Sequence, residues 1–197
     1  MTRPERVSRT TVYTNPWLTL FEDEIIRGDR PGRYTVVERA DSVALLVRSD
    51  RDRLLFVHTY RYPTGELSLE LPMGGIDPGE EPVAAALREL AEETALTLRS
   101  GNLRHHGVFR GCPGLTPQSV WVYSAAVDDA LLDSATTRHS GDDLEGTRVV
   151  ALSEVPALIA AGRITDSFTL SSLALSGWAF PPRPDDLGPG TMSGHRP

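Results

Sequence analysis

Residues 70–96 read ELPMGGIDPGEEPVAAALRELAEETAL, and the arrangement of the whole chain follows from this stretch. An apolar strand end at Leu69–Pro72 runs into the glycine pair Gly74-Gly75, which predicts a turn. A helix is predicted to follow, because Pro82 is tolerated in a first helical turn and the residues after it are strong helix formers. The order is therefore strand, glycine-rich turn and helix.

Three glutamates, Glu89, Glu92 and Glu93, stand near the C-terminal end of the predicted helix. Its apolar stripe is predicted to comprise Val83, Leu87, Leu90 and Thr94. On a helical wheel, Glu89 and Glu93 fall on the flank of this stripe and not opposite it. Carboxylates one turn apart beside a glycine-rich loop can bind Mg²⁺, which keeps some waters and takes further ligands from substrate phosphates.

The alternative is a solvated, salt-bridged helix face, which is the commoner meaning of charges at helical spacing. Two features favour a cation here. The carboxylates lie at the end of the helix where the macrodipole disfavours negative charge. They also form a like-charge cluster, which costs stability unless a cation neutralises it.

The spacing of this stretch resembles the signature of the Nudix hydrolases: Gly74, five residues, Glu80, seven residues, then Arg88-Glu89-Leu90-Ala91-Glu92-Glu93. Those enzymes cleave a nucleoside diphosphate linked to another group, using Mg²⁺ or Mn²⁺. Their pattern continues with a glycine where this chain has Ala95. A left-handed cap would cost alanine about 1 kcal/mol, and the departure touches no metal ligand.

The resemblance implies an α/β (α+β) fold: a Nudix-type α/β/α sandwich with a mixed central sheet and an N-terminal β extension. It also implies Mg²⁺ or Mn²⁺ held by Glu89 and Glu93, with Glu92 in support and the Met73 carbonyl as a further ligand. Arg88 is expected to pair with Glu80 and orient the helix. Gly74 is expected in the substrate-binding loop.

A second resemblance, to the ADP-ribose and nucleotide-sugar pyrophosphatase subgroup, lies upstream of the helix. It rests on Thr59-Tyr60-Arg61-Tyr62-Pro63 and on Glu70-Leu71-Pro72. Arg61 is expected to clamp a phosphate, because a guanidinium donates to two oxygens at once. Glu70 is expected to hold Arg61 or a substrate hydroxyl. A surface arginine and a structural ion pair remain the alternatives for these two residues.

Two loops later in the chain also resemble this subgroup. Pro113-Gly114 match it, but Gln118 stands where a glutamate is expected. Glutamine cannot ionise, so Gln118 is kept only as a substrate-binding candidate and the identity of the substrate stays open. In the acidic stretch Asp142–Glu145, Glu145 best fits the glutamate that activates water, with a merely solvated loop as the alternative.

The composition of the chain argues against several classes of function. A formal charge of −7 over 197 residues argues against non-specific binding to nucleic acid or to an anionic membrane. The single cysteine, Cys112, excludes an intramolecular disulfide. No apolar run approaches the length of a membrane-spanning helix, and the N-terminus lacks the apolar core of a signal peptide, so a cytoplasmic protein is expected.

The chain is predicted to divide into residues 1–40, 41–178 and 179–197. The first part holds N-terminal strands that, by the resemblance, pair two subunits into a homodimer. The second is the Nudix domain, in which an apolar strand at Ser42–Arg48 is central and Leu54–Tyr60 is its hairpin partner. The third is rich in proline and glycine and is expected to be disordered.

The function implied is metal-dependent hydrolysis of ADP-ribose or a related nucleoside diphosphate sugar, giving a nucleoside monophosphate and a sugar phosphate. One alternative is a Nudix hydrolase of another diphosphate: a nucleoside triphosphate, a dinucleoside polyphosphate or a prenyl diphosphate. The other is a non-catalytic module that binds a nucleotide-sugar.

Overall fold

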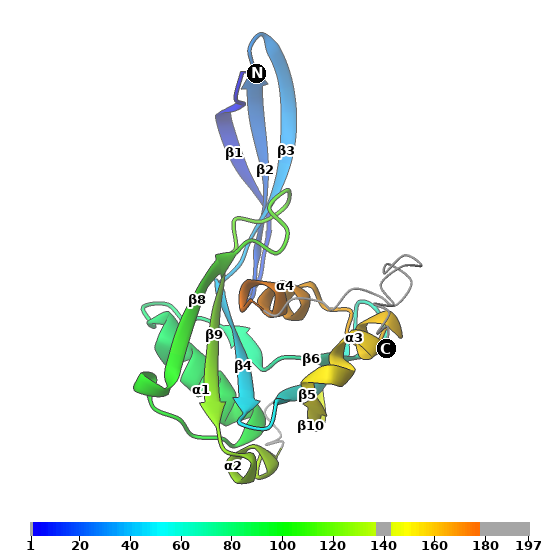
Figure 1. Ribbon diagram of the computed structural model, residues 1–197. Coiled ribbons are helices and arrows are strands. Elements are labelled where there is room, and N and C mark those ends of the chain that lie inside the picture. Colours follow the sequence, from blue (N-terminus) through cyan, green and yellow to red (C-terminus); the bar gives the residue numbers. More distant parts are fainter. Residues whose placement is uncertain (1, 137–142, 178–197) are drawn as a thin grey trace, which may run out of the picture.

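A computed structural model describes residues 2–136 and 143–177 of the chain (Figure 1). The strands form two separate sheets, one of three strands and one of seven. The smaller sheet projects from the body that the larger sheet and the helices form (Figure 1). Two predictions fall outside the described residues: Asp142 of the acidic stretch, and the tail at 179–197.

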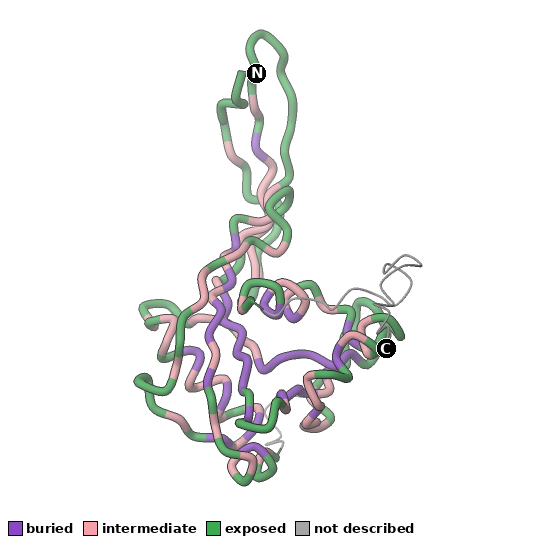
Figure 2. Tube along the Cα trace, viewed as in Figure 1, coloured by how far each residue is buried: buried purple, intermediate pink, exposed green. Residues whose placement is uncertain are grey.

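The projecting sheet is an antiparallel meander of β1 (Glu5–Thr14), β2 (Thr19–Arg27) and β3 (Arg30–Glu38). One ion cluster ties all three strands together: Arg9 on β1 donates to Asp23 on β2 and to Glu38 on β3. Both faces remain largely exposed, so this sheet has almost no core of its own (Figure 2).

The seven-stranded sheet has the order β10-β5-β4-β9-β8, with β6 paired to β5 and β7 paired to β4. Its strands are β4 (Ser42–Ser49), β5 (Arg53–Arg61), β6 (Glu66–Glu70), β7 (Met73–Gly75), β8 (Leu103–Phe109), β9 (Val120–Val127) and β10 (Leu144–Ala151). Strands β4 and β9 run parallel and the other pairs are antiparallel, so the sheet is mixed, as predicted.

The predicted hairpin of β4 and β5 is formed only at its turn. Arg48 and Leu54 are the sole residues that pair between the two strands in the described chain. Beyond them β5 diverges and pairs with β6 and β10, while β4 pairs along its length with β9 and at its start with β7. The two apolar stretches predicted correctly that β4 and β5 are neighbours. They could not show that β4 and β5 form most of their hydrogen bonds with other strands.

Helices cover both faces of this sheet. The helical segments are α1 (Pro82–Thr94), α2 (Asp129–Asp133), α3 (Val155–Ala160) and α4 (Ser167–Leu175), with short 3-10 turns at Ser100–Asn102 and Leu152–Glu154. Leu45 and Val47 of β4 pack in the cluster that includes α1, whereas Leu46 packs in the cluster that includes Leu173 of α4. These two apolar clusters make the predicted α/β/α layering.

Helix α1 buries a slightly different face from the one predicted. Its buried residues are Ala85, Ala86, Leu90 and Thr94, whereas Leu87 is only partly buried. The small alanine side chains let the helix approach the sheet closely. Because the buried face is rotated relative to the predicted stripe, Glu89 and Glu93 are turned further toward the sheet than predicted. The helix ends at Ala95, which adopts the left-handed conformation with φ of 60°.

Aspartate side chains cap two of the later helices. Asp166 caps α4 by accepting a hydrogen bond of 2.7 Å from the Thr169 amide. Asp128 caps α2, a helix that was not predicted, by accepting from the Leu131 amide. No helix in the described ranges has both the length and the apolar character needed to span a membrane.

Candidate active site

The glycine-rich turn of the sequence is β7, and the carboxylate of Glu89 lies directly against it. A β-carbon placed on Gly74 would stand 1.9 Å from the Glu89 carboxyl carbon. Glycine is therefore required here by close approach and not by an unusual backbone angle. Burial raises the pKa of Glu89 above its ordinary value, and the hydrogen bond and charge of Arg88 oppose that shift.

Glu93, one turn further along α1, reaches the same strand. Its Oε2 accepts a hydrogen bond of 3.1 Å from the Met73 amide. Burial raises the pKa of Glu93 to about 8, and the neighbouring charge of Glu89 adds to the rise. Two adjacent carboxylates with raised pKa values are a site where a cation would be strongly favoured, because it would stabilise both charged forms.

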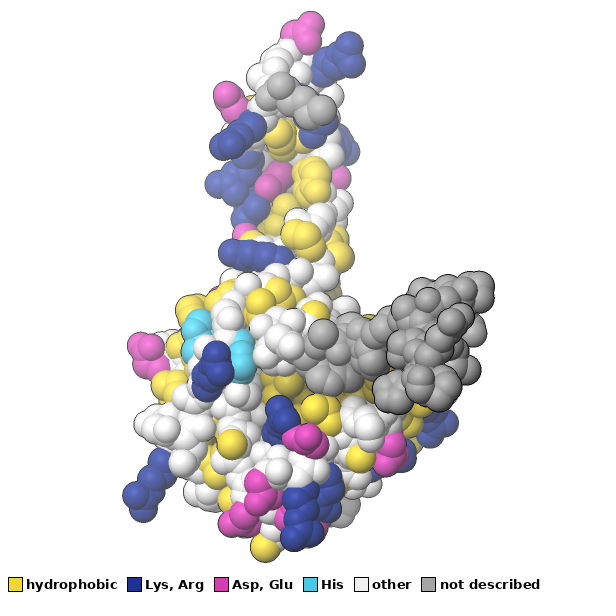
Figure 3. Space-filling view, in the orientation of Figure 1, with side chains coloured by type: hydrophobic (Ala, Val, Ile, Leu, Met, Phe, Trp, Pro, Cys, Tyr) yellow, Lys and Arg dark blue, Asp and Glu magenta, His cyan; other side chains and the backbone are white. Residues whose placement is uncertain are grey.

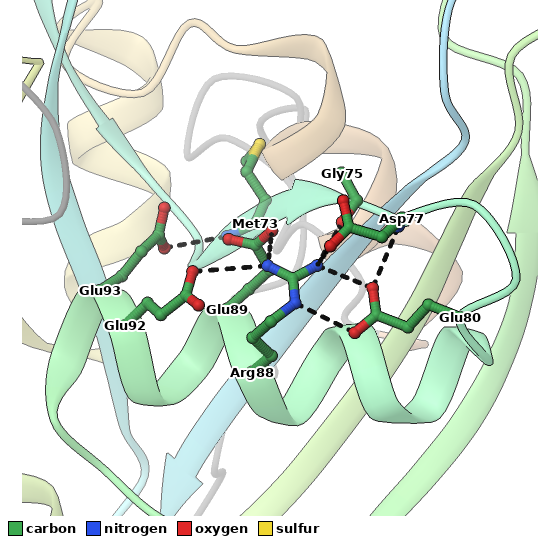
Figure 4. A network of polar contacts seen from close by, with 8 residues as sticks. All are labelled: Met73, Gly75, Asp77, Glu80, Arg88, Glu89, Glu92 and Glu93. Atoms are coloured by element: carbon green, nitrogen blue, oxygen red, sulfur yellow. Dashed lines mark hydrogen bonds and ion pairs between the residues drawn. The ribbon is translucent and has the colours of Figure 1, made fainter.

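Arg88 lies at the centre of a network that fixes the turn to the helix (Figure 4). Its guanidinium donates to both oxygens of Glu80, at 3.0 and 2.8 Å, and to the Gly75 carbonyl at 2.8 Å. Glu80 in turn accepts from the Asp77 amide. The pairing of Arg88 with Glu80 that the resemblance implied is thus present, and it holds the pKa of Glu80 below its usual range.

The three glutamates among the predicted metal ligands are not arranged alike. Glu92 is half exposed and lies 3.4 Å from the Arg88 guanidinium. Glu89 also accepts a hydrogen bond from Arg88, at 2.8 Å, but Glu89 and Glu93 both lie against β7. Within residues 2–136 and 143–177, no three acidic, histidine or cysteine side chains converge on one point. Two carboxylates still fit Mg²⁺ or Mn²⁺, because such ions bind through one or two carboxylates and complete their shell with water and phosphate oxygens.

Arg61 and Glu70 form the second polar unit of the site. Glu70 is 1% exposed, and both its oxygens accept from the Arg61 guanidinium, one at 3.0 Å. They come from the neighbouring strands β5 and β6. The structure therefore shows Glu70 holding Arg61, which was one of the two alternatives for this glutamate. Arg61 remains partly exposed, so its Nη1 edge is open to an anion.

A cavity of about 310 Å³ lies between Arg61 and strand β7, and neither Glu89 nor Glu93 is on its wall. Its walls are Arg39, Ser42, Arg61, Met73, Gly74, Gly75, Asp166 and Phe168. Sequence reasoning did not select Arg39, Asp166 or Phe168 as site residues. The capping pattern at Asp166 was visible in the sequence, but only the fold shows that the first turn of α4 faces β7. Two arginines on the walls suit an anionic ligand.

Two predicted residues lie elsewhere. Gln118 is buried, and its amide nitrogen donates to the Ala40 carbonyl at 2.7 Å and to the Ser42 hydroxyl at 2.9 Å. These contacts tie its loop to β4, so the amide group already has partners in the protein. Glu145 is exposed on a bulge of β10, between Leu144 and Gly146, which pair with Thr59 and His58, and it is not on the cavity wall.

Comparisons with known proteins agree with this geometry. The model of the NUDIX domain matches residues 38–168. An ADP-ribose pyrophosphatase of Bacillus subtilis is 28% identical over 120 residues, which are 60% of this chain and 64% of that protein. A CMP-5'-(N-acetyl-N-hydroxy-3-aminopropyl)phosphonate hydrolase of Streptomyces rubellomurinus is 29% identical over 180 residues, 89% of this chain and 81% of that one. An ADP-sugar pyrophosphatase of Mus musculus is 44% identical over 59 residues, 28% and 27% of the two chains.

Proposed function

The chain belongs to the Nudix family and is a Nudix pyrophosphohydrolase, and from this premise we propose that it hydrolyses ADP-ribose or a related nucleoside diphosphate sugar. The products would be a nucleoside monophosphate and a sugar phosphate. The names of the Bacillus and mouse relatives support this substrate class. The observation that carries the proposal is the cavity that joins Arg61 to the β7 strand lying over Glu89 and Glu93.

Each residue has a role that follows from its contacts. Glu89 and Glu93 would hold Mg²⁺ or Mn²⁺, which supplies charge neutralisation of the diphosphate when bound. Arg61, fixed by buried Glu70, would pair with a phosphate oxygen through its free edge. Arg88 would keep the helix and β7 in register through Glu80 and the Gly75 carbonyl.

Water activation is assigned to Glu145, as the resemblance implies. Its strand β10 lies next to β5, the strand that ends in Arg61, and the Tyr60 amide donates to the Asp143 carbonyl at 2.7 Å. This pairing joins the backbone beside Glu145 to the strand that carries Arg61, which supports the assignment, although Glu145 does not line the cavity. Replacement of Glu145 by Gln is expected to lower kcat with little change in KM.

The second candidate is hydrolysis of a nucleotide joined to another phosphorus group. It is favoured by the extent of the match to the Streptomyces phosphonate hydrolase, which covers 89% of this chain. Nucleoside triphosphates, dinucleoside polyphosphates and prenyl diphosphates are further substrates to test, and a non-catalytic nucleotide-sugar binder is the remaining alternative. One panel tests all of them: each compound is incubated with Mg²⁺ or Mn²⁺, nucleotide and phosphate release are followed by chromatography, and binding is followed by calorimetry.

A homodimer is proposed as the working assembly. The projecting sheet exposes large apolar side chains, among them Val7, Val12, Tyr13 and Trp17, and Figure 3 shows hydrophobic side chains along it. A sheet of three strands with both faces in water lacks a core, and burial against a second copy would supply one. A cytoplasmic location and the lack of nucleic-acid or membrane partners remain expectations from composition alone.

A further inference from the structure

A second and larger cavity lies on the face of the sheet opposite α1. Its volume is about 500 Å³, which is in the range of small-molecule pockets. It is bounded by β4, β5, β8 and β9 and by the end of α4. Leu46 and Leu173 on its wall belong to the apolar cluster on the α4 side, so the sheet separates this cavity from α1 and its carboxylates.

The apolar part of the wall is formed by Leu46, Leu54 and Leu173, which come from β4, β5 and α4. Such a surface can hold a hydrocarbon or aromatic group of a ligand. Figure 3 views this side of the molecule, where hydrophobic side chains lie close to arginine and histidine side chains.

The ionisable side chains on the cavity wall are all basic in the part of the chain that the structure describes. Arg48, Arg104 and His106 line the cavity, and no aspartate or glutamate of the described residues does. This contrasts with the chain as a whole, in which acidic residues outnumber basic ones and the charge is −7. The bias toward positive charge therefore belongs to this cavity and not to the general composition.

Arg104 is the group best placed to bind an anion there. Arg48 is paired with Asp52, whereas Arg104 forms no ion pair with any residue in the described ranges. His106 shares a hydrogen bond of 2.7 Å with Ser124, and burial and the charge of Arg104 lower its pKa. At neutral pH the histidine is then mostly uncharged, so Arg104 supplies the unneutralised positive charge.

We propose that this cavity is a separate binding site for an amphipathic carboxylate, whose charged end pairs with Arg104 and whose apolar body packs on Leu46, Leu54 and Leu173. The proposal does not depend on the hydrolase chemistry, because none of these residues belongs to the diphosphate site. Octanoate is a suitable probe, since it has one carboxylate on a short alkyl chain. Octanol, which has a chain of the same length but no charge, is the control ligand.

The test is calorimetric titration of the full chain with octanoate and with octanol. One site is expected for octanoate, with octanol binding at least about tenfold more weakly, since a charge-assisted hydrogen bond is lost.

Arg104→Gln should lower the octanoate affinity by about tenfold or more. Ala126→Trp should abolish binding, because Ala126 is exposed on the cavity wall and a larger side chain would fill the space. Arg30→Gln, an exposed arginine on the projecting sheet, is the matched control and should bind as the parent does.

Two results would overturn the proposal. The first is the absence of octanoate binding to the parent protein. The second is equal binding by the parent, Arg104→Gln and Ala126→Trp, which would place the probe elsewhere.

Discussion

The carboxyl carbon of Glu89 lies 1.9 Å from the point where a β-carbon on Gly74 would stand. The two residues are fifteen positions apart in the sequence, and β7 passes over α1 where they meet. Gly75, the next residue, has open space at the same position. Only the first glycine of the pair is therefore required by the position of the Glu89 carboxylate.

Gly74→Ala is expected to displace the Glu89 carboxylate while the protein stays folded, because the clash is with the end of a flexible side chain. A misplacement of about 1 Å can cost on the order of 100-fold in rate, so kcat/KM should fall by about that factor. Gly75→Ala is the matched control and should change kcat/KM less than about threefold, since its new methyl group meets nothing. Equal losses in the two variants would contradict the proposed role of Glu89.

The sequence predicted the parts of the site that lie on one continuous segment. Gly74, Arg88 and Glu93 keep their spacing on strand, turn and helix, so a local pattern was sufficient to find them. Arg39, Asp166 and Phe168 were missed because they join the cavity from distant segments. The helical wheel placed only Glu89 and Glu93 on the flank of the apolar stripe, which agrees with the half-exposed position of Glu92.

Glu93→Gln tests the metal assignment. The amide has the shape of the carboxylate but cannot offer its negative charge to a cation, so kcat is expected to fall by about 100-fold or more. The far-ultraviolet circular dichroism should stay unchanged, and the increase in Tm that Mn²⁺ gives the parent should be lost. Glu92→Gln is the control, since Glu92 faces solvent and Arg88, and its effect should be below about tenfold. Undiminished turnover and metal binding in Glu93→Gln would remove Glu93 from the site.

For the pair of Arg61 and Glu70, we expect one substitution to change substrate binding alone and the other to change both binding and stability. Arg61→Lys keeps a positive charge but loses the two-pronged geometry, so KM should rise by about tenfold with little change in Tm. Glu70→Gln leaves a buried amide facing the guanidinium and should lower the free energy of unfolding by about 1–3 kcal/mol as well as raising KM. Denaturant unfolding and steady-state kinetics measure the two effects.

Glu66→Gln is the control, because Glu66 is exposed and its only pairing with Arg61 is between the backbones of β6 and β5. A similar rise in KM for Glu66→Gln would show that loss of any nearby negative charge is sufficient.

Ala95→Gly should stabilise the protein. Ala95 has φ of 60°, a conformation that costs alanine about 1 kcal/mol and glycine almost nothing. Glycine also has more freedom in the unfolded chain, so the expected net gain is about 0.5 kcal/mol, seen as a higher denaturant midpoint. Ala91→Gly, in the last turns of the same helix with ordinary helical angles, should instead lose about 1 kcal/mol. Destabilisation by both changes would mean that the left-handed cap at Ala95 is not formed in solution.

The projecting sheet gives the last prediction, on the homodimer. Trp17 is 78% exposed and Val12 is 59% exposed, and a charge on such residues would have to be buried if two copies packed there. Val12→Glu and Trp17→Glu should each shift the molar mass measured by light scattering from that of two chains toward that of one. Val108→Glu, on the exposed strand β8 of the larger sheet, is the matched control and should remain a dimer. A dimer that withstands both changes but dissociates with Val108→Glu would place the interface on the larger sheet, while a parent that is already monomeric would refute the assembly itself.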